Sequence, residues 1–154
     1  MLVKVLIACL LMALTVFLHA LGFSALLRAM MRWHVLARSG FMTAVRMVVG
    51  LTCWLILVHL VEISVWGLFY FLQGCMPNAK TAFYFSAVTY TTLGDASLVL
   101  PEPWRMFAPL EALTAMLMCG LSTGLFFAIV SQWISNWTQR RAASEPHAAE
   151  PQNK

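Results

Sequence analysis

Residues 89–97 read TYTTLGDAS, and this stretch decides the fold because it places polar side chains and a glycine between two long apolar segments. Charged residues make up only 10% of the chain. At membrane depth, a polar and non-helical segment is tolerated only where protein buries it or where it lines a water-filled path. The stretch therefore predicts a polar path inside a membrane protein.

The composition places the chain among membrane proteins. Of the 154 residues, 61% are hydrophobic, and the mean hydropathy is +0.79. These values are far too apolar for an ordinary soluble domain. The net charge of +4 comes from few residues, mostly near the ends of apolar segments, so membrane topology explains it better than nucleic-acid binding does. We expect the lipid bilayer as a partner and no nucleic acid.

Three apolar segments are long enough to cross a bilayer, which needs roughly 20 helical residues. They cover residues 3–27, 45–72 and 107–134. Between the last two segments, the apolar and aromatic patch at 82–90 is too short to span, so we expect a re-entrant helix followed by an extended return. After residue 137 the chain is polar and contains proline, which predicts a disordered tail.

The basic residues set the predicted orientation. Four arginines lie around the junction of the first two apolar segments: Arg28, Arg32, Arg38 and Arg46. Because cytoplasmic loops are enriched in Lys and Arg, they place this junction inside and the N-terminus outside. Arg140 and Arg141 then lie in the cytoplasm with the C-terminus, and Lys4 is the one exception. We predict a multi-pass protein of the inner (plasma) membrane.

Residues 83–101, FYFSAVTYTTLGDASLVLP, resemble the pore helix and filter of the potassium-channel superfamily. The resemblance is to its small bacterial members with two transmembrane helices and a pore, often described as ion channels of the two-pore-domain potassium channel family. The runs HLVEISVW at 59–66 and PWRMFAPLEALTAML at 103–117 are similar too, so the resemblance covers residues 57–130. It implies an all-α membrane protein with three transmembrane helices, a re-entrant pore helix and a homotetrameric central pore. It also implies passive ion transport without enzymatic activity or a cofactor.

Under this resemblance the chain divides into three parts. Residues 1–40 form an extra N-terminal transmembrane helix and a cytoplasmic loop. Residues 41–137 form the pore domain, which consists of an outer helix, a pore helix, a filter and an inner helix. Residues 138–154 form a disordered cytoplasmic tail.

The candidate selectivity filter departs from the family pattern, which is TTLGYGD or TTVGYGD. Asp95 stands in place of the aromatic residue, Ala96 in place of the second glycine and Ser97 in place of the aspartate. We interpret these as substitutions without a gap, because residues 98–101 then keep the family register. The predicted filter residues are Thr91, Thr92, Leu93, Gly94, Asp95, Ala96 and Ser97.

This departure bears on ion selectivity. Potassium filters strip the ion of water with stacked rings of backbone carbonyls, and the second glycine adopts backbone angles that alanine reaches only at a cost. Ala96 therefore disfavours the outer filter geometry. With fewer coordinating layers, the pore should discriminate poorly between K⁺ and Na⁺. The predicted ligands of the permeating cation are Thr92, Leu93, Gly94 and Asp95.

The aspartate also points toward calcium. The pattern Thr-Leu-Gly-Asp resembles that of the bacterial non-selective sodium-potassium channel. Four Asp95 carboxylates around one axis would attract cations, divalent ones most strongly, and hard oxygen ligands suit Ca²⁺. We expect external calcium either to permeate or to block, and mutual repulsion to raise the pKa of the carboxylates. The alternative interpretation of Asp95 is an Asx turn or an N-cap after a short helix.

Four ionisable residues within the apolar segments need a separate interpretation. His59 and Glu62 share a helix face, and a carboxylate in the membrane is unfavourable unless it is paired or neutral. We predict a structural polar pair that supports the filter, with an ion or proton site as the alternative. His19 is a lone polar residue in the first segment and is interpreted as a satisfied packing histidine. Glu111 either faces the outer vestibule or favours the N-terminus of its helix, and the second is preferred.

Gly120 and Gly124 form a small-xxx-small pair in the third apolar segment. Such pairs usually let membrane helices approach closely, while the resemblance adds a gating hinge below the filter. We weigh the two interpretations equally. The leading function is a weakly selective cation channel. The alternatives are a potassium-selective channel with an unusual outer filter, and a non-conducting scaffold or regulatory subunit with a degenerate pore.

Overall fold

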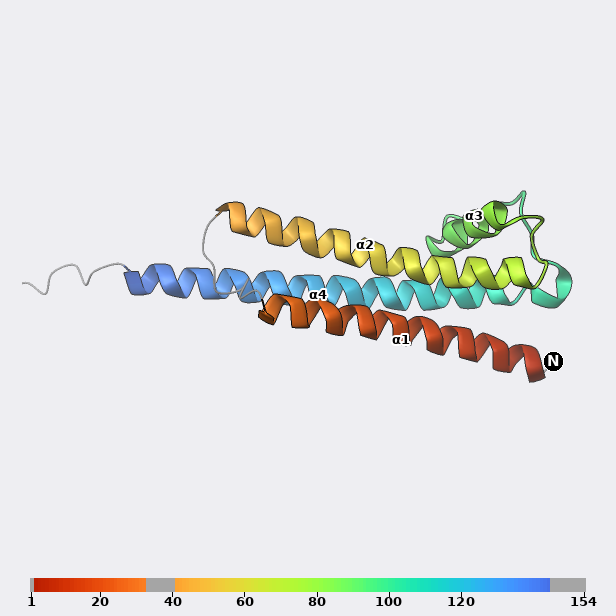
Figure 1. The fold of residues 1–154 in the computed structure, drawn as a ribbon, viewed down its shortest axis with the longest axis horizontal. Coiled ribbons are helices and arrows are strands. Elements are labelled where there is room, and N and C mark those ends of the chain that lie inside the picture. Colours follow the sequence, from red (N-terminus) through yellow and green to blue (C-terminus); the bar gives the residue numbers. More distant parts are fainter. Residues whose placement is uncertain (1, 33–40, 145–154) are drawn as a thin grey trace, which may run out of the picture.

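A computed structural model describes residues 2–32 and 41–144 of the chain. These residues contain helices and no strand, which confirms the all-α prediction for the described part. The elements are α1 (Leu2–Arg32), α2 (Phe41–Leu72), α3 (Ala79–Tyr90), the short 3₁₀ helix η2 (Glu102–Trp104) and α4 (Phe107–Ser144). In Figure 1, α1, α2 and α4 run side by side along the long axis, and α3 packs against α2 at one end.

Three helices are long and apolar enough to cross a membrane. They are Leu2–Arg32, Met42–Leu72 and Glu102–Ala143, with mean hydropathies of 2.4, 2.1 and 2.0. A helix satisfies its own backbone hydrogen bonds, which is what lipid demands of a spanning segment. Large apolar side chains point outward along all three helices, as contact with lipid or with other subunits requires. The protein is therefore a multi-pass membrane protein.

The third long helix extends beyond the predicted segment. It continues to Ser144, so the prediction of disorder is wrong for residues 138–144. These residues, TQRRAAS, include alanine, arginine and glutamine, which favour helix, and an existing helix gains one hydrogen bond for each residue it adds. The Arg141 guanidinium also lies 4.7 Å from the centroid of the Trp137 ring. The rest of the predicted tail and the predicted cytoplasmic loop at 33–40 lie outside the described residues.

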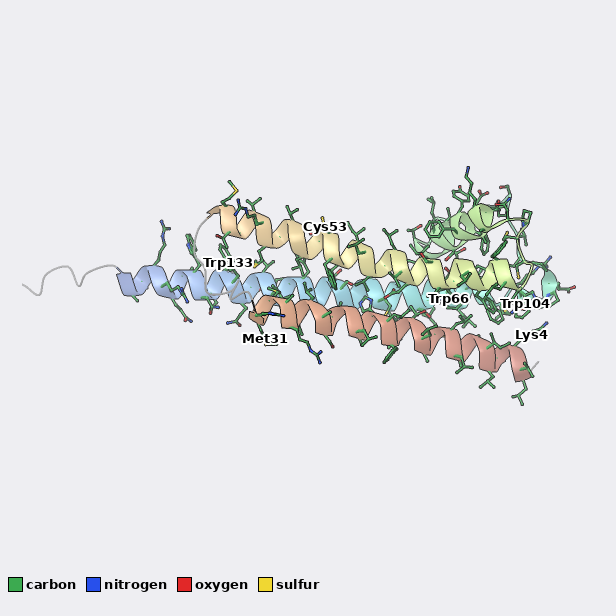
Figure 2. All side chains as sticks on the ribbon, viewed as in Figure 1. Lys4, Met31, Cys53, Trp66, Trp104 and Trp133 are labelled. Carbon is green, nitrogen blue, oxygen red and sulfur yellow. The ribbon has the colours of Figure 1, made fainter. Side chains whose placement is uncertain are left out.

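The start of α1 lies at the same end of the molecule as η2. The Lys4 ammonium is 5.2 Å from the centroid of the Trp104 ring, and Figure 2 shows both side chains at this end, with Trp133 toward the other. The chain then runs away along α1, returns along α2 and runs away again along α4. We call this end, which also holds α3, the loop end.

Glycine and tryptophan bring α1 close to α2. A Cβ atom added to Gly22 would lie 2.5 Å from Cγ2 of Val58, so only glycine permits this approach. The Trp54 indole donates a hydrogen bond to the Gly22 carbonyl at 3.0 Å. Nearer the loop end, the buried Trp66 indole donates to the Thr15 hydroxyl at 3.0 Å. These contacts attach α1 to the part of the chain that resembles a pore domain.

The helix α3 begins three residues earlier than the predicted patch because Asn78 caps it. The Asn78 side chain accepts a hydrogen bond from the Thr81 amide at 2.9 Å, which satisfies one free donor of the first turn. Toward its middle, α3 packs directly on the α2 backbone, because a Cβ atom at Gly67 would lie 3.0 Å from the Cα atom of Phe83. An apolar core at the loop end holds this arrangement, and its largest members are Trp66, Tyr70, Phe85 and Phe107.

Candidate functional site

The segment that follows α3 turns sharply but stays tied to the helix. Thr91 caps α3, and its amide donates to the Ala87 carbonyl at 3.1 Å. Thr92 has a φ of 59° and Gly94 a φ of 68°. A left-handed conformation is easy for glycine but strained for a β-branched residue such as threonine. The Gly94 amide, which donates to the Val88 carbonyl at 2.9 Å, helps to hold the strained turn in place.

The next residues form a compact turn around Asp95. The Asp95 carboxylate accepts hydrogen bonds from the Ser97 amide at 2.9 Å and from the Ser97 hydroxyl at 2.6 Å. The Asp95 carbonyl accepts from the Leu98 amide at 3.1 Å. The structure thus contains the Asx turn that was the alternative interpretation of Asp95. The interpretation of Asp95 as a filter residue stays a prediction.

The Asx turn also acts on the charge of Asp95. The hydrogen bond from the Ser97 hydroxyl, followed by the one from the Ser97 amide, holds the pKa of the Asp95 carboxyl below its ordinary value. The Asp95 carboxyl is therefore ionised at neutral pH in the single chain. The predicted repulsion between four such groups acts in the opposite direction, and it stays a prediction for the assembled protein.

Among the described residues, no donor reaches the five consecutive carbonyls from Tyr90 to Gly94, which precede this turn. They include the carbonyls of Thr92, Leu93 and Gly94. The Leu93 side chain is 78% exposed, and its neighbours on both sides are exposed as well. On one flank, a cavity of about 380 Å³ lies between this segment and the start of α4. The segment is therefore an open edge of the chain.

The depth of this edge follows from the end of α3. The Tyr90 hydroxyl donates to Glu62, which lies ten residues before the end of α2 at Leu72. At about 1.5 Å per helical residue, these ten residues correspond to about 15 Å. That is roughly half of a hydrocarbon core of about 30 Å. The free carbonyls therefore start about 15 Å from the loop end of α2, which is mid-depth for a hydrocarbon core that begins at Leu72.

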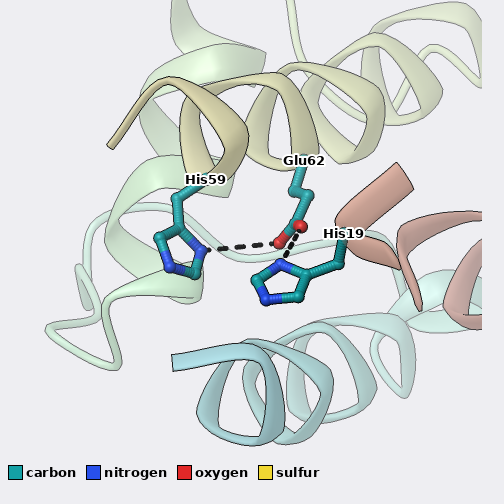
Figure 3. A group of neighbouring side chains, drawn as sticks. All are labelled: His19, His59 and Glu62. Carbon is teal, nitrogen blue, oxygen red and sulfur yellow. Dashed lines mark hydrogen bonds and ion pairs between the residues drawn. The ribbon is translucent and has the colours of Figure 1, made fainter. Parts of the chain in front are cut away.

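A buried polar cluster lies at this depth. Glu62 is 0% exposed, and one of its carboxylate oxygens lies 2.6 Å from Nδ1 of His19 on α1. The other accepts a hydrogen bond from the Tyr90 hydroxyl and lies 3.5 Å from Nδ1 of His59. Figure 3 shows both imidazole rings directed at the carboxylate. The structure thus brings together the predicted pair His59 and Glu62 and adds two partners.

The same cluster includes a serine on α4. Nδ1 of His59 lies 2.8 Å from the Tyr90 hydroxyl, and its Nε2 lies 3.1 Å from the Ser122 hydroxyl. The Ser122 hydroxyl also lies 3.3 Å from Nε2 of His19. The five side chains Glu62, His19, Ser122, His59 and Tyr90 therefore form a closed ring that joins α1, α2, α3 and α4. We call it the polar ring.

His19 is buried and hydrogen-bonded at both ring nitrogens, which agrees with its interpretation as a satisfied packing histidine, but its partners on the other helices were not predicted. A histidine and a carboxylate that lie in different apolar segments are each unfavourable alone, and this was a signal that they pair. The sequence does not show which of His59 and His19 faces Glu62, because helix rotation decides it. By residue type, His19, His59 and Glu62 could hold a metal ion, since their ligand atoms lie within 4.8 Å of one another. Each of these side chains is already hydrogen-bonded within the polar ring.

The position of Glu111 in the structure shows that both predicted interpretations of this residue are wrong. It is fully buried, and its carboxylate accepts a hydrogen bond from the Tyr70 hydroxyl at 2.8 Å. Its other oxygen lies 2.5 Å from the Ser86 hydroxyl of α3, which is also 2.9 Å from the Ile63 carbonyl of α2. Glu111 is the fifth residue of α4, so it points past the first turn and into the bundle. It joins α4 to α2 and α3 instead of facing a vestibule.

The two glycines of α4 have no close neighbour in one subunit. No heavy atom lies within 4 Å of a Cβ atom placed on Gly120 or on Gly124. Among the described residues, the expected close approach of helices at this pair is therefore absent. Contact with another subunit or hinge bending stays a prediction, and α4 is continuous from Phe107 to Ser144.

A family model described as "Ion channel" matches residues 56–132. The match covers half of the chain. The match begins in the middle of α2, includes α3 and the segment with free carbonyls, and ends within α4. No curated protein and no solved structure matches the chain.

Proposed function

The chain belongs to the ion channel family, and from this premise we propose that it is a homotetrameric cation channel that is weakly selective among monovalent cations. In this proposal α3 is a re-entrant pore helix, residues 91–97 form the filter and α4 is the inner helix. Transport is passive and involves no chemical step. The permeating ions are K⁺ and Na⁺, and external calcium permeates or blocks.

The observation that carries this proposal is the run of free carbonyls that ends with residues 92–94, inside the predicted filter. Backbone carbonyls at membrane depth must find a partner in protein, water or an ion. The chain offers none of its described donors to these three groups. A dehydrated cation is a suitable partner, because rings of carbonyl oxygens replace its hydration shell.

A single subunit is an incomplete structure for this purpose. It leaves Leu93 78% exposed and leaves Gly120 and Gly124 uncovered. Four copies around one axis would cover the open edge and would place the free carbonyls opposite one another. The apolar Phe127, which is also exposed on α4, would then lie toward the end of the pore that is far from the filter.

The turn at Asp95 supports weak selectivity. The Asp95 carbonyl is committed to the Leu98 amide, so the run of free carbonyls ends at Gly94. A filter with fewer carbonyl rings replaces less of the hydration shell and distinguishes cations less well. The ionised Asp95 carboxylates would lie at the outer end of this short filter and would attract divalent cations most strongly.

The charges support an orientation with the loop end outside. The loop end holds three basic residues of the described chain, Lys4, Lys80 and Arg105. The opposite ends of α1, α2 and α4 hold five, Arg28, Arg32, Arg46, Arg140 and Arg141. Because cytoplasmic ends carry the excess of arginine and lysine, we place the N-terminus outside and the C-terminus in the cytoplasm.

The test is a flux measurement with purified protein in liposomes. Reversal potentials under opposing K⁺ and Na⁺ gradients should lie close to zero for a weakly selective pore. A potential close to the K⁺ equilibrium value would instead identify a potassium-selective channel. Absence of cation flux from protein that is folded and tetrameric by native mass spectrometry would refute the proposal and would favour a scaffold.

A further inference from the structure

The polar ring has a property that follows from counting its protons. Five links close it, in the order Glu62, His19, Ser122, His59, Tyr90 and back to Glu62. Each link joins two polar atoms and needs one proton between them. Tyrosine and serine carry one proton each, and each neutral histidine carries one. With an ionised Glu62 these groups supply only four protons for five links.

The fifth proton completes the ring and neutralises it. If it lies on His19, that ring donates to Glu62 and to Ser122, Ser122 donates to His59, His59 to Tyr90, and Tyr90 to the second oxygen of Glu62. The proton can equally lie on His59 or on Glu62 with every link still made. In each case the sum of the charges is zero. With four protons, two lone pairs face each other in one link, and with six protons two donors do.

Loss or gain of one proton is unfavourable in the polar ring. Glu62 is fully buried, His19 is 2% exposed and His59 is 19% exposed. One proton more or fewer would leave a net charge in a low-dielectric interior and would also break a hydrogen bond. The polar ring should therefore contain five protons over an intermediate range of pH, gain one in acid and lose one in alkali.

Other titratable groups that act on the polar ring are on α4. The Cys119 thiol interacts electrostatically with Glu62, and the Glu111 carboxyl with Tyr90. On α1, α2 and α3, the groups nearest to the ring are its own members His19, His59, Glu62 and Tyr90. Protons can reach the ring from a cavity of about 260 Å³ between α2 and α4, which His59 and Ser122 help to line.

The ring is joined to the proposed filter through one residue. Tyr90 ends α3, and Thr91 is the first filter residue. The Tyr90 hydroxyl takes part in two of the five links. A broken link therefore loosens the end of α3 directly before the proposed filter. The middle of α3 is held separately by Ser86 and Glu111, so the loss affects the filter end of the helix.

We propose that the polar ring is a proton-binding site that controls the pore, and that it holds the filter end of α3 only while it contains five protons. The inference rests on the proposed channel function. Conduction then has a maximum at intermediate pH and falls in both acid and alkali. A divalent metal ion held by His19, His59 and Glu62 is the competing explanation of this cluster. The complete set of hydrogen bonds favours protons.

The first experiment measures cation flux in liposomes with equal pH on both sides, from about pH 4 to about pH 10, which covers the ordinary pKa values of the three residue types. Flux through the wild-type protein should fall at least about fivefold from its maximum toward each end of the range. The variant Ser122→Ala removes the two links between the imidazole rings. The three remaining links need three protons, which Tyr90 and the two neutral histidines supply while Glu62 is ionised. Loss of the further proton in alkali then breaks no link, so the fall of the flux in alkali should disappear.

The matched control is Ser64→Ala on α2. The Ser64 hydroxyl is exposed and bonds to the Leu60 carbonyl of its own helix at 2.7 Å, so the variant should keep the wild-type maximum. A flat wild-type profile, or an alkaline fall that Ser122→Ala leaves unchanged, would overturn the inference while the channel function stands. Zinc bound at one ion per subunit by the wild-type protein, and not by His19→Ala, would overturn it as well.

A second experiment counts protons without any conduction. Histidine labelled with ¹⁵N and infrared spectra of the carboxyl groups are recorded at neutral pH in lipid bilayers. The wild-type protein should show either His19 or His59 with both ring nitrogens protonated, or a protonated Glu62. Two neutral histidines together with an ionised Glu62 in the wild-type protein would refute the proton count. If the protein conducts at no pH, the proposed function fails, and this spectroscopic count still decides whether the ring holds its fifth proton.

Discussion

Replacing Ser86 by alanine should weaken the attachment of α3 to the rest of the bundle. The Ser86 hydroxyl lies 2.5 Å from a carboxylate oxygen of Glu111 and 2.9 Å from the Ile63 carbonyl. Both Ser86 and Glu111 are fully buried. The variant leaves one oxygen of Glu111 without its partner, and such a loss costs about 1–3 kcal/mol. We take about 2 kcal/mol as the expected loss of unfolding free energy.

The exposed Ser64 again provides the matched control. Both substitutions replace a helical serine by alanine, so the gain in helix propensity is the same in each. The difference between the two variants therefore isolates the buried hydrogen bond. For a chain of this length, about 2 kcal/mol corresponds to a Tm difference of about 4–8 °C.

The assay is thermal unfolding in lipid nanodiscs, followed by circular dichroism. Ser86→Ala should unfold at a lower temperature than the wild-type protein, and Ser64→Ala should not. Equal Tm values for the two variants would show that the contact between Ser86 and Glu111 adds no stability. The role that we assign to Glu111 would then be wrong.

The remaining predictions concern the filter and its support. Asp95→Asn should abolish the response of the current to external calcium, and an unchanged response would remove Asp95 from the ion path. Ser97→Ala removes the hydrogen bond that most lowers the Asp95 pKa, so that pKa rises. During acidification, the variant should therefore lose its calcium response at a higher pH than the wild-type protein does. Loss at an equal or lower pH would contradict this prediction. Gly67→Ala places a Cβ atom 3.0 Å from the Cα atom of Phe83, so it should displace α3 and reduce the flux. The control is Gly50→Ala on the same helix, whose Cβ atom meets no atom within 4 Å and which should conduct normally. Equal flux from both glycine variants would show that α3 tolerates the shift.

Two separate polar contacts hold α3 in the membrane part of the bundle. Its middle is joined to α4 through Ser86 and Glu111, and its end is joined to α2 through Tyr90 and Glu62. Within the described residues, no buried side-chain nitrogen or oxygen lacks a hydrogen-bond partner. This complete pairing is what makes a polar interior acceptable in a membrane bundle. It also explains how a helix of only 12 residues can keep a fixed position.

The sequence alone determined the three spanning helices, the short helix between the last two and the polar segment after it. These features depend on hydropathy and spacing along the chain, which are local properties. The helical extension to Ser144 was missed because the helix passes beyond the apolar residues that had predicted it. The matched part of the chain, residues 56–132, agrees closely with the resemblance at 57–130 that its motifs had indicated.

Only the tertiary structure decided the partners of the polar residues. Glu62 faces His19 on α1 as well as the predicted His59, and Glu111 points into the bundle instead of toward the outside. Both outcomes depend on the rotation and tilt of whole helices, which close packing at Gly22 and Gly67 sets. A nearly uniform apolar surface carries little information about such rotation, because lipid and protein neighbours are equally apolar. The pairing of buried polar groups therefore appears only when the helices are placed together.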